Sequence, residues 1–429
     1  MQDHDAAGAG GERRRWSRVL ALAAVAATVA LAACGGDDEE STGGGGSGGG
    51  EQSGLSGEPI KAMTVASINT EGPPFPMIHE TSRIFAEWVN DNGGIKGRPL
   101  EVINCDDRGV GPGAEDCARQ AVQEEVVAVV GNYTFMADSI VPILEQSNIA
   151  WFGTCCAGTP TELTSKASFP VGSSLMYAAG FAKKAVDDGC QTINGVVIDG
   201  AQPYIPIMEN ALKSQNAKFN KPPIILPPTS QDYSPQVAEA ISDDADCVLM
   251  VVSEGPYTAW MGAWAQAGTE ARMYGPQGNL DAVSIKGNEE AAEGSVIAGS
   301  FPDLSTEPWA DYRAALEQYE ANDEYDYNSL GGMGTWAGYT AFRKVIEEQI
   351  SGDTVDAQTF LDAASKTSSL DMEGMVPTLD FTKEWSDFPE YRRLFNRSVV
   401  FSQVKDGKIQ PLTTEFEDVT QAALGESSG

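Results

Sequence analysis

Histidine and basic residues are scarce in this sequence. It has 2 His in 429 residues, and 62 Asp and Glu outnumber 28 Lys and Arg, which gives a formal net charge of −34 at pH 7. A chain this negative repels phosphate backbones, so we expect no nucleic-acid partner. Only His4 and His79 could supply imidazole to a zinc site, so we expect no metal and no other cofactor.

Common catalytic motifs are missing as well. No predicted strand-to-helix turn carries a Gly-x-Ser-x-Gly elbow, and no Gly-Lys-Ser/Thr phosphate-binding loop occurs. His79 falls on an amphipathic helical pattern, which is typical of a structural residue. We therefore expect no enzymatic activity, with an extracellular enzyme as the weaker alternative.

The sequence also lacks a long apolar run. Four arginines between positions 13 and 18 precede thirteen uncharged residues at 19–31, which end at Leu31-Ala32-Ala33-Cys34. Such a run is too short to span a bilayer comfortably and is typical of an export signal. We predict a signal peptide at 1–33, with Cys34 as the acylated first residue of the mature chain, because the cleavage region resembles a bacterial lipobox. A transmembrane anchor is the alternative.

What remains has the composition of a tether followed by a folded protein. Residues 34–58 are rich in glycine and acidic residues and cannot build a core, so we expect a flexible tether there. The whole chain is 41% hydrophobic and 21% charged, which is typical of a packed globular protein. It is too long for one ordinary core and suits two lobes.

Predicted strands and helices alternate from position 60 onward. Apolar strand patterns occur at 60–68, 100–105, 126–130 and 149–152, and again at 192–199, 224–226, 247–252 and 272–274. This alternation predicts an α/β fold of two doubly wound parallel-sheet lobes. Helices at 307–320, 335–348 and 356–365 are expected to return to the first lobe, and a hairpin turning at Asp406-Gly407 to the second. The expected segments are 60–172 and 302–375 for lobe 1, 173–301 and 376–415 for lobe 2, and 416–429 for a tail.

Ligands of such sheets bind where the strands end. The buried strand at 126–130 opens into Gly131-Asn132-Tyr133-Thr134, and the strand at 247–252 opens into another loop that contains Tyr257-Thr258. Two loops of one kind indicate two lobes that face each other.

Several short segments share one family's signature. They are Asn92-Gly-Gly-Ile-Lys-Gly-Arg-Pro-Leu100, Cys105-Asp106-Asp107, Gly158-Thr159 with Glu162-Leu163-Thr164, and Tyr274-Gly-Pro-Gln-Gly278. In this order, from about residue 60 to 412, the chain resembles the solute-binding subunits of ABC importers, in particular the leucine/isoleucine/valine-binding type. The resemblance implies a type I periplasmic-binding-protein fold, whose two lobes are joined by a multi-strand hinge and close over a small solute.

The resemblance also assigns ligand-binding residues. Thr134, Gly158 and Thr159 would hold the solute's carboxylate through hydroxyls and backbone N–H groups, and helix N-termini favour an anion at such a place. Tyr204 matches the second-lobe tyrosine that covers the ligand.

The residues expected to pair with the solute's ammonium group depart from the family pattern. Amino-acid binders of this family usually have a glutamate where this chain has Gln277, and an amide supplies no counter-charge to an ammonium group. Either Glu254 in the neighbouring loop supplies that charge, or the solute has no ammonium. Phe75 in the first loop and Phe135 beside the carboxylate loop would form aromatic walls.

Six cysteines remain after Cys34 in a chain predicted to be exported, where disulfides persist. Cys105 ends a predicted strand and Cys117 begins the next helix, so a bridge between them would close a short loop. Cys190 and Cys247 each precede a strand and could meet if those strands are parallel neighbours. The adjacent Cys155 and Cys156 could form a vicinal disulfide, but free thiols or pairing elsewhere are together favoured.

These features predict a monomeric lipoprotein on the extracytoplasmic face of a bacterial cell membrane. It would capture a small polar organic solute, such as an amino acid (branched-chain ones included) or a related carboxylate or amide. It would deliver this solute to the membrane subunits of an ABC permease. A ligand-sensing receptor that signals through a partner is the alternative from another class.

Overall fold

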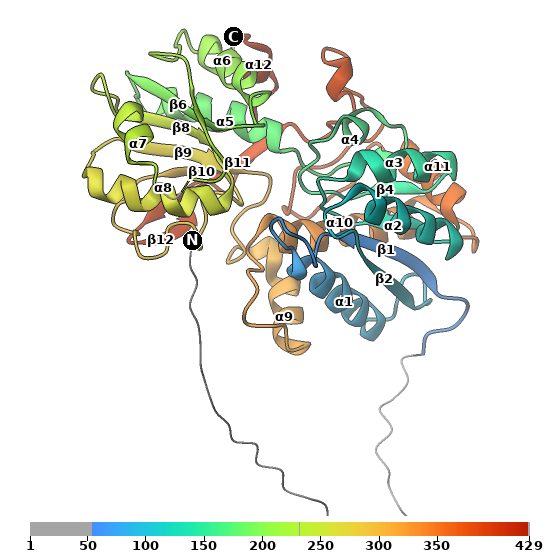
Figure 1. The fold of residues 1–429 in the computed structure, drawn as a ribbon. Helices are drawn as coiled ribbons and strands as arrows, with labels where there is room; N and C mark the ends of the chain where they lie inside the picture. The colour runs from blue at the N-terminus through green and yellow to red at the C-terminus, as the bar shows by residue number, and fades with distance from the viewer. Residues whose placement is uncertain (1–53, 231, 428–429) are drawn as a thin grey trace, which may run out of the picture. The chain divides into compact units, whose positions relative to one another are not determined.

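The computed structural model describes residues 54–230 and 232–427. The predicted signal peptide, Cys34 and most of the predicted tether lie outside these residues. Two sheets with flanking helices make up most of the described chain (Figure 1). In that part of the chain, no helix combines the length and the apolar character that crossing a bilayer requires.

The first sheet is parallel and is covered by helices on both faces. Its strands are β1 (Ile60–Ala66), β2 (Leu100–Asp106), β3 (Ala128–Val130), β4 (Ala150–Phe152) and β5 (Ser168–Phe169). Its helices are α1 (Pro76–Asp91), α2 (Gly111–Gln123), α3 (Ala137–Gln146), α4 (Pro160–Thr164), α9 (Ala310–Gln318), α10 (Leu330–Gln349) and α11 (Ala357–Lys366). The strand order is β2-β1-β3-β4-β5. Because side chains alternate along a strand, Ala128 packs with α1, α10 and α11, whereas Val129 packs with α2 and α3.

The second sheet is mixed. Its strands are β6 (Ile193–Ile198), β7 (Ile224–Leu226), β8 (Cys247–Val251), β9 (Arg272–Pro276), β10 (Val296–Gly299), β11 (Ser398–Lys405), β12 (Lys408–Pro411) and β13 (Glu417–Asp418). Its helices are α5 (Ser174–Asp187), α6 (Tyr204–Ser214), α7 (Ser234–Ala240), α8 (Glu254–Ala267) and α12 (Thr420–Leu424). The strand order is β12-β11-β10-β9-β8-β6-β7, with β13 beside β11. Leu249 packs with α5 and α6, and its neighbour Val248 packs with α7 and α8, so both lobes have the doubly wound α/β architecture predicted.

The last strands depart from a purely parallel sheet. β11 runs antiparallel to β10 and to β12. The β11–β12 hairpin turns at Asp406 and Gly407, whose φ angles of 53° and 68° suit the type I′ turn of a two-residue hairpin, which confirms the predicted hairpin. Two short 3₁₀ helices, Glu307–Trp309 and Pro389–Tyr391, lie in the connections between the sheets.

Three connections link the lobes within residues 54–427: between β5 and α5, after β10, and before β11. The connection before β11 is bonded to the one between β5 and α5 and to the first sheet. Asn396 Nδ2 donates to Val171 O at 2.9 Å, and the buried Arg393 donates to Ser168 O at 2.8 Å. These connections form the multi-strand hinge that the family resemblance implies.

Some element boundaries differ from the expectation. The loop expected after β8 is instead the first turn of α8, which begins at Glu254 and buries Tyr257 in the core. α10 begins at Leu330, five residues before the predicted start at 335, because Ser329 caps it by accepting the Gly332 N–H at 3.2 Å. In the segment expected as a tail, β13 pairs with β11, and Asn210 of α6 donates to Ala423 O of α12 at 2.9 Å.

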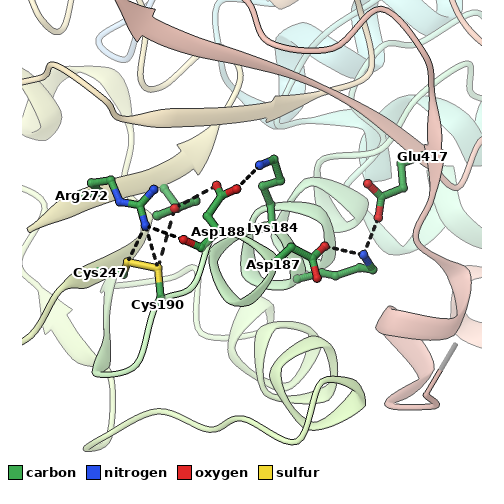
Figure 2. Close-up of polar contacts among 9 residues, drawn as sticks. Lys184, Asp187, Asp188, Cys190, Cys247, Arg272 and Glu417 are labelled. Carbon is green, nitrogen blue, oxygen red and sulfur yellow. Dashed lines mark hydrogen bonds and ion pairs between the residues drawn. A yellow bond between two sulfur atoms is a disulfide. The ribbon is translucent and has the colours of Figure 1, made fainter.

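Both cysteine pairs proposed from sequence position are bonded. Cys105–Cys117 joins β2 to α2, with the Cα atoms 5.7 Å apart. Cys190–Cys247 has a Cα separation of 5.9 Å, and β6 and β8 are the parallel neighbours that this pairing requires. Arg272 Nη2 lies 3.8 and 3.9 Å from the two sulfurs (Figure 2). Asp246 approaches this pair, but sulfurs bonded to each other are not available as thiolate ligands for a metal.

Candidate ligand-binding cavity

A cavity of about 380 Å³ lies where strands of both sheets end. The first sheet contributes the loops after β3 and β4, and the second sheet contributes the ends of β6, β8 and β9 with the segments that follow them. This is the position expected for a ligand of parallel α/β sheets. The volume lies within the range that is usual for small-molecule sites, roughly 300 to 1,000 Å³.

The walls of the cavity are largely aromatic and aliphatic. They are formed by Tyr133, Phe135, Tyr177, Phe181, Ile198, Tyr204, Val251, Val252, Pro276 and Leu330. Most of these residues were not predicted as ligand contacts, because an apolar side chain is equally typical of a residue packed in the core. Position at a strand end was the signal available for Ile198 and Val251. No comparable signal marked Tyr177 or Phe181, which lie inside α5.

Six of the eight predicted ligand-binding residues line this cavity. They are Thr134, Phe135, Gly158, Thr159, Tyr204 and Gln277. Phe75 does not line it, but it packs edge-on against Tyr133 at a ring-centroid distance of 4.9 Å. Glu254 begins α8 directly after the lining residue Ser253, and its side chain lies outside the described part of the chain.

The donors predicted to hold a solute carboxylate are already bonded to a carboxylate of the protein. Glu162 Oε2 accepts the N–H of Gly158 at 3.1 Å and the N–H of Thr159 at 3.0 Å. The Thr159 hydroxyl in turn receives the Glu162 N–H at the start of α4, which completes a capping box. Glu162 Oε1 accepts the indole N–H of Trp151 at 3.1 Å. The Thr-Pro-Thr-Glu spacing could have revealed this arrangement from the sequence.

Thr134 is likewise hydrogen-bonded to other groups of the protein. Its hydroxyl donates to the buried Asp107 and accepts the Met136 N–H at 2.9 Å. Asp107 also accepts from the hydroxyl of Ser67 at 2.6 Å and from the N–H of Gly109 at 2.8 Å. The first-lobe rim therefore presents paired groups to the cavity rather than an empty anion cradle.

Gln277 lines the cavity with an amide that is bonded at both ends. Its Nε2 donates to Phe301 O at 3.1 Å, and its Oε1 accepts the Phe301 N–H at 3.3 Å. The amide fits there because Gly299 has no side chain: a Cβ on Gly299 would lie 2.0 Å from Gln277 Oε1. Gln277 thus ties the end of β9 to the connection that follows β10.

The second-lobe rim presents hydroxyl groups. The hydroxyls of Tyr204 and Ser174 share a hydrogen bond of 2.7 Å beside the cavity. Burial raises the pKa of Tyr204, so this phenol stays neutral and can donate. The Tyr177 hydroxyl is also buried: burial raises its pKa, and hydrogen bonding from Ser300 opposes that rise, so this phenol is neutral as well.

The cavity has almost no formal charge. Among the described side chains that line it, none is Lys, Arg or His, and Glu162 is the single carboxylate. Burial raises the pKa of Glu162, while its hydrogen bonds from Gly158 and Thr159 act in the opposite direction. The site is therefore suited to a solute with a substantial apolar part and a few hydrogen-bonding groups.

A vicinal disulfide stands at the edge of the cavity. Cys155 and Cys156 are bonded to each other in the loop after β4, and Cys156 lines the cavity. Free thiols or pairing elsewhere were favoured from the sequence, and the structure has the pairing that was not favoured. The other four cysteines of the described residues pair among themselves.

Two α/β lobes with a cavity at the strand ends and several hinge connections define the architecture of a solute-binding protein. The sequence matches the periplasmic binding protein family over residues 73–408, so the chain belongs to that family. No curated protein sequence matches it.

Solved structures share this fold at low sequence identity. The fatty acid ABC transporter substrate-binding protein from Thermomonospora curvata is 16% identical, with a TM-score of 0.68 over 86% of this chain and 95% of that one. The leucine-binding protein LivK from Thermotoga maritima is 18% identical, with a TM-score of 0.62 over 83% and 97%. A solute-binding protein from R. palustris in complex with benzoate is 16% identical, with a TM-score of 0.61 over 83% and 96%.

Proposed function

We propose that this chain is an extracytoplasmic solute-binding lipoprotein that hands a small organic solute to an ABC importer and has no catalytic step. The observation that carries the proposal is the cavity lined by strand ends of both lobes. A solute that touches both rims would stabilise the closed arrangement of the hinge, which is the signal an importer needs.

The solute class we propose is an amino acid, branched-chain ones included, or a related carboxylate or amide with an apolar body. The aromatic and aliphatic walls suit such a body, and the Ser174–Tyr204 hydroxyl pair suits its polar end. The names of the similar structures, a leucine-binding protein, a fatty acid transporter subunit and a benzoate complex, point to ligands that join a carboxylate to an apolar part. Since Gly158, Thr159 and Thr134 are already paired, they would hold an anion only after exchanging partners.

A thermal-shift panel of amino acids, aromatic acids, fatty acids and their amides tests the proposal. A ligand that binds only the folded protein at a hundredfold excess over Kd stabilises it by about 2.7 kcal/mol, which such a panel detects. A panel without any shift would contradict the proposed function. Glu254 is proposed as the ammonium partner: if amino acids shift the melt, Glu254→Gln should abolish that shift, and Glu209→Gln on the exposed face of α6 should preserve it.

The anchor and the oligomeric state are separate proposals. Cys34 would carry the acyl chains, so Cys34→Ala should move the protein from the membrane fraction to the soluble fraction, and intact mass should show the loss of the lipid. Light scattering should give the mass of a monomer.

A further inference from the structure

The disulfide between Cys155 and Cys156 lies between the cavity and a helix of the first lobe. Cys156 lines the cavity and is 7% exposed, whereas Cys155 is 2% exposed. Cys155 packs against α10 at Gly334, where an added Cβ would lie 2.3 Å from Cys155 Cβ. Cys155 of the bonded pair therefore packs against α10, and Cys156 faces the cavity.

The same loop is bonded to the first hinge connection. The Val171 N–H donates to Thr154 O at 3.0 Å, and the Ser173 hydroxyl donates to Ala157 O at 3.2 Å. Gly172 approaches so closely that a Cβ there would lie 2.3 Å from Cys155 O. This loop therefore contacts both the cavity and the first hinge connection.

The chemistry of the bond suits a wall that contacts apolar groups. A disulfide has no N–H or O–H to satisfy, and its sulfurs are polarisable atoms that pack well against aromatic rings and alkyl groups. A covalent bond between neighbouring residues also removes alternative conformations of the loop before the solute arrives. Less ordering then remains to be done on binding, which favours affinity.

We propose that the Cys155–Cys156 disulfide is a solute-contacting element that pre-organises the cavity, so that the oxidised protein binds its solute more tightly than the reduced one. The inference rests on the proposed function, since it needs a solute in this cavity. Reduction by a dithiol breaks the S–S bond: the dithiol supplies two electrons and two protons, becomes a disulfide itself, and leaves two cysteine thiols.

The inference is tested by calorimetry with the best solute from the thermal-shift panel, on wild type, Cys155→Ala/Cys156→Ala and a matched control, Cys105→Ala/Cys117→Ala. The control removes a disulfide that does not line the cavity. The vicinal variant should raise Kd about tenfold, which is about 1.4 kcal/mol, and the control should stay within about twofold of wild type. Equal Kd values for wild type and the vicinal variant would overturn the inference, as would two free thiols in the mass of the alkylated native protein.

Hydrogen exchange separates failure of this inference from failure of the proposed function. If no compound in the panel binds, the proposed function fails, and the loop is then judged without solute. Amides of residues 153–159 should exchange faster in the vicinal variant, and in wild type treated with dithiothreitol, than in the untreated control variant. Unchanged exchange in this loop would overturn pre-organisation even if a solute is found.

Discussion

The carboxylate of Glu162 accepts both the backbone N–H and the hydroxyl of Thr159, at 3.0 and 3.1 Å. A buried carboxylate of the protein thus occupies the donors that would otherwise face an anionic solute. The same carboxylate accepts from Gly158 and from the buried indole of Trp151, so its removal would leave one buried donor and the part-buried donors of the rim without this acceptor. Glu162 is therefore expected to matter more for the shape of the first-lobe rim than for direct contact with the solute.

Glu162→Gln should change how stability depends on pH. Burial raises the pKa of Glu162 in the folded chain above the ordinary glutamic-acid value that applies in the unfolded chain. As pH rises, the unfolded chain therefore loses this proton at a lower pH than the folded chain does. The contribution of the buried, protonated Glu162 to the free energy of unfolding is fully present below the ordinary pKa. It is lost as pH rises through the pKa of Glu162 in the folded chain. The free energy of unfolding of wild type should therefore include a decline over this window that Glu162→Gln lacks, as measured by urea denaturation at successive pH values.

Glu209→Gln is the matched control for that measurement. Glu209 is exposed on α6, so its variant should keep the wild-type pH profile. Identical profiles for Glu162→Gln and wild type would show that Glu162 has the same proton affinity in the folded and unfolded chain.

Gly338→Ala should destabilise the first lobe. Gly338 of α10 lies directly against the strand ends, where an added Cβ would be 2.6 Å from Gly153 O and 3.0 Å from Gly131 Cα. Overpacking of this kind typically reduces the free energy of unfolding by about 1 to 3 kcal/mol. Gly262→Ala in α8 is the control, because a Cβ there meets nothing within 4 Å, and it should stabilise by up to about 1 kcal/mol. Urea unfolding that shows the same sign for both variants would contradict this account of α10 packing.

The architecture could be predicted from the sequence because a buried strand is encoded locally, as a continuous run of apolar residues. The run at Cys247–Val251 is apolar throughout, and the structure buries every one of its residues under helices on both faces. The start of α10 could not be predicted from the sequence in this way, because Gly331, Gly332 and Gly334 have low helix propensity. Their small size instead serves packing that only the folded chain reveals, such as the approach of Gly334 to Cys155.

The candidate site was predictable only in part, for a related reason. The family resemblance assigned Thr159 and Tyr204 to the ligand, and both line the cavity. Which acceptor a given N–H uses depends on tertiary neighbours. Glu162 follows Thr159 by three residues and fits a capping box, so in this structure the N–H of Thr159 is bonded to a carboxylate of the protein.

The two structural disulfides should contribute unequally to stability. Cys105–Cys117 spans 12 residues and Cys190–Cys247 spans 57. In the chain-entropy description, longer loops restrict the unfolded state more, so we expect losses of about 3 kcal/mol for Cys105→Ala/Cys117→Ala and about 4 kcal/mol for Cys190→Ala/Cys247→Ala. Urea denaturation of both double variants checks the order. The reverse order would mean that loop length does not decide how much each of these two disulfides contributes.

Tyr204→Phe should weaken solute binding without altering the fold. The Tyr204 hydroxyl shares a 2.7 Å hydrogen bond with Ser174 at the cavity, and its loss removes a donor that a polar solute can use. One hydrogen bond is worth roughly 1 kcal/mol, so Kd should rise about fivefold, and Tyr204→Ala should raise it further because the aromatic wall is lost too. Tyr257→Phe is the control: Tyr257 is fully buried between α8 and the second sheet, away from the cavity lining, and its variant should keep the wild-type Kd. Calorimetry that shows equal Kd values for Tyr204→Phe and Tyr257→Phe would mean that the solute makes no hydrogen bond to this rim, and that the apolar walls carry the affinity.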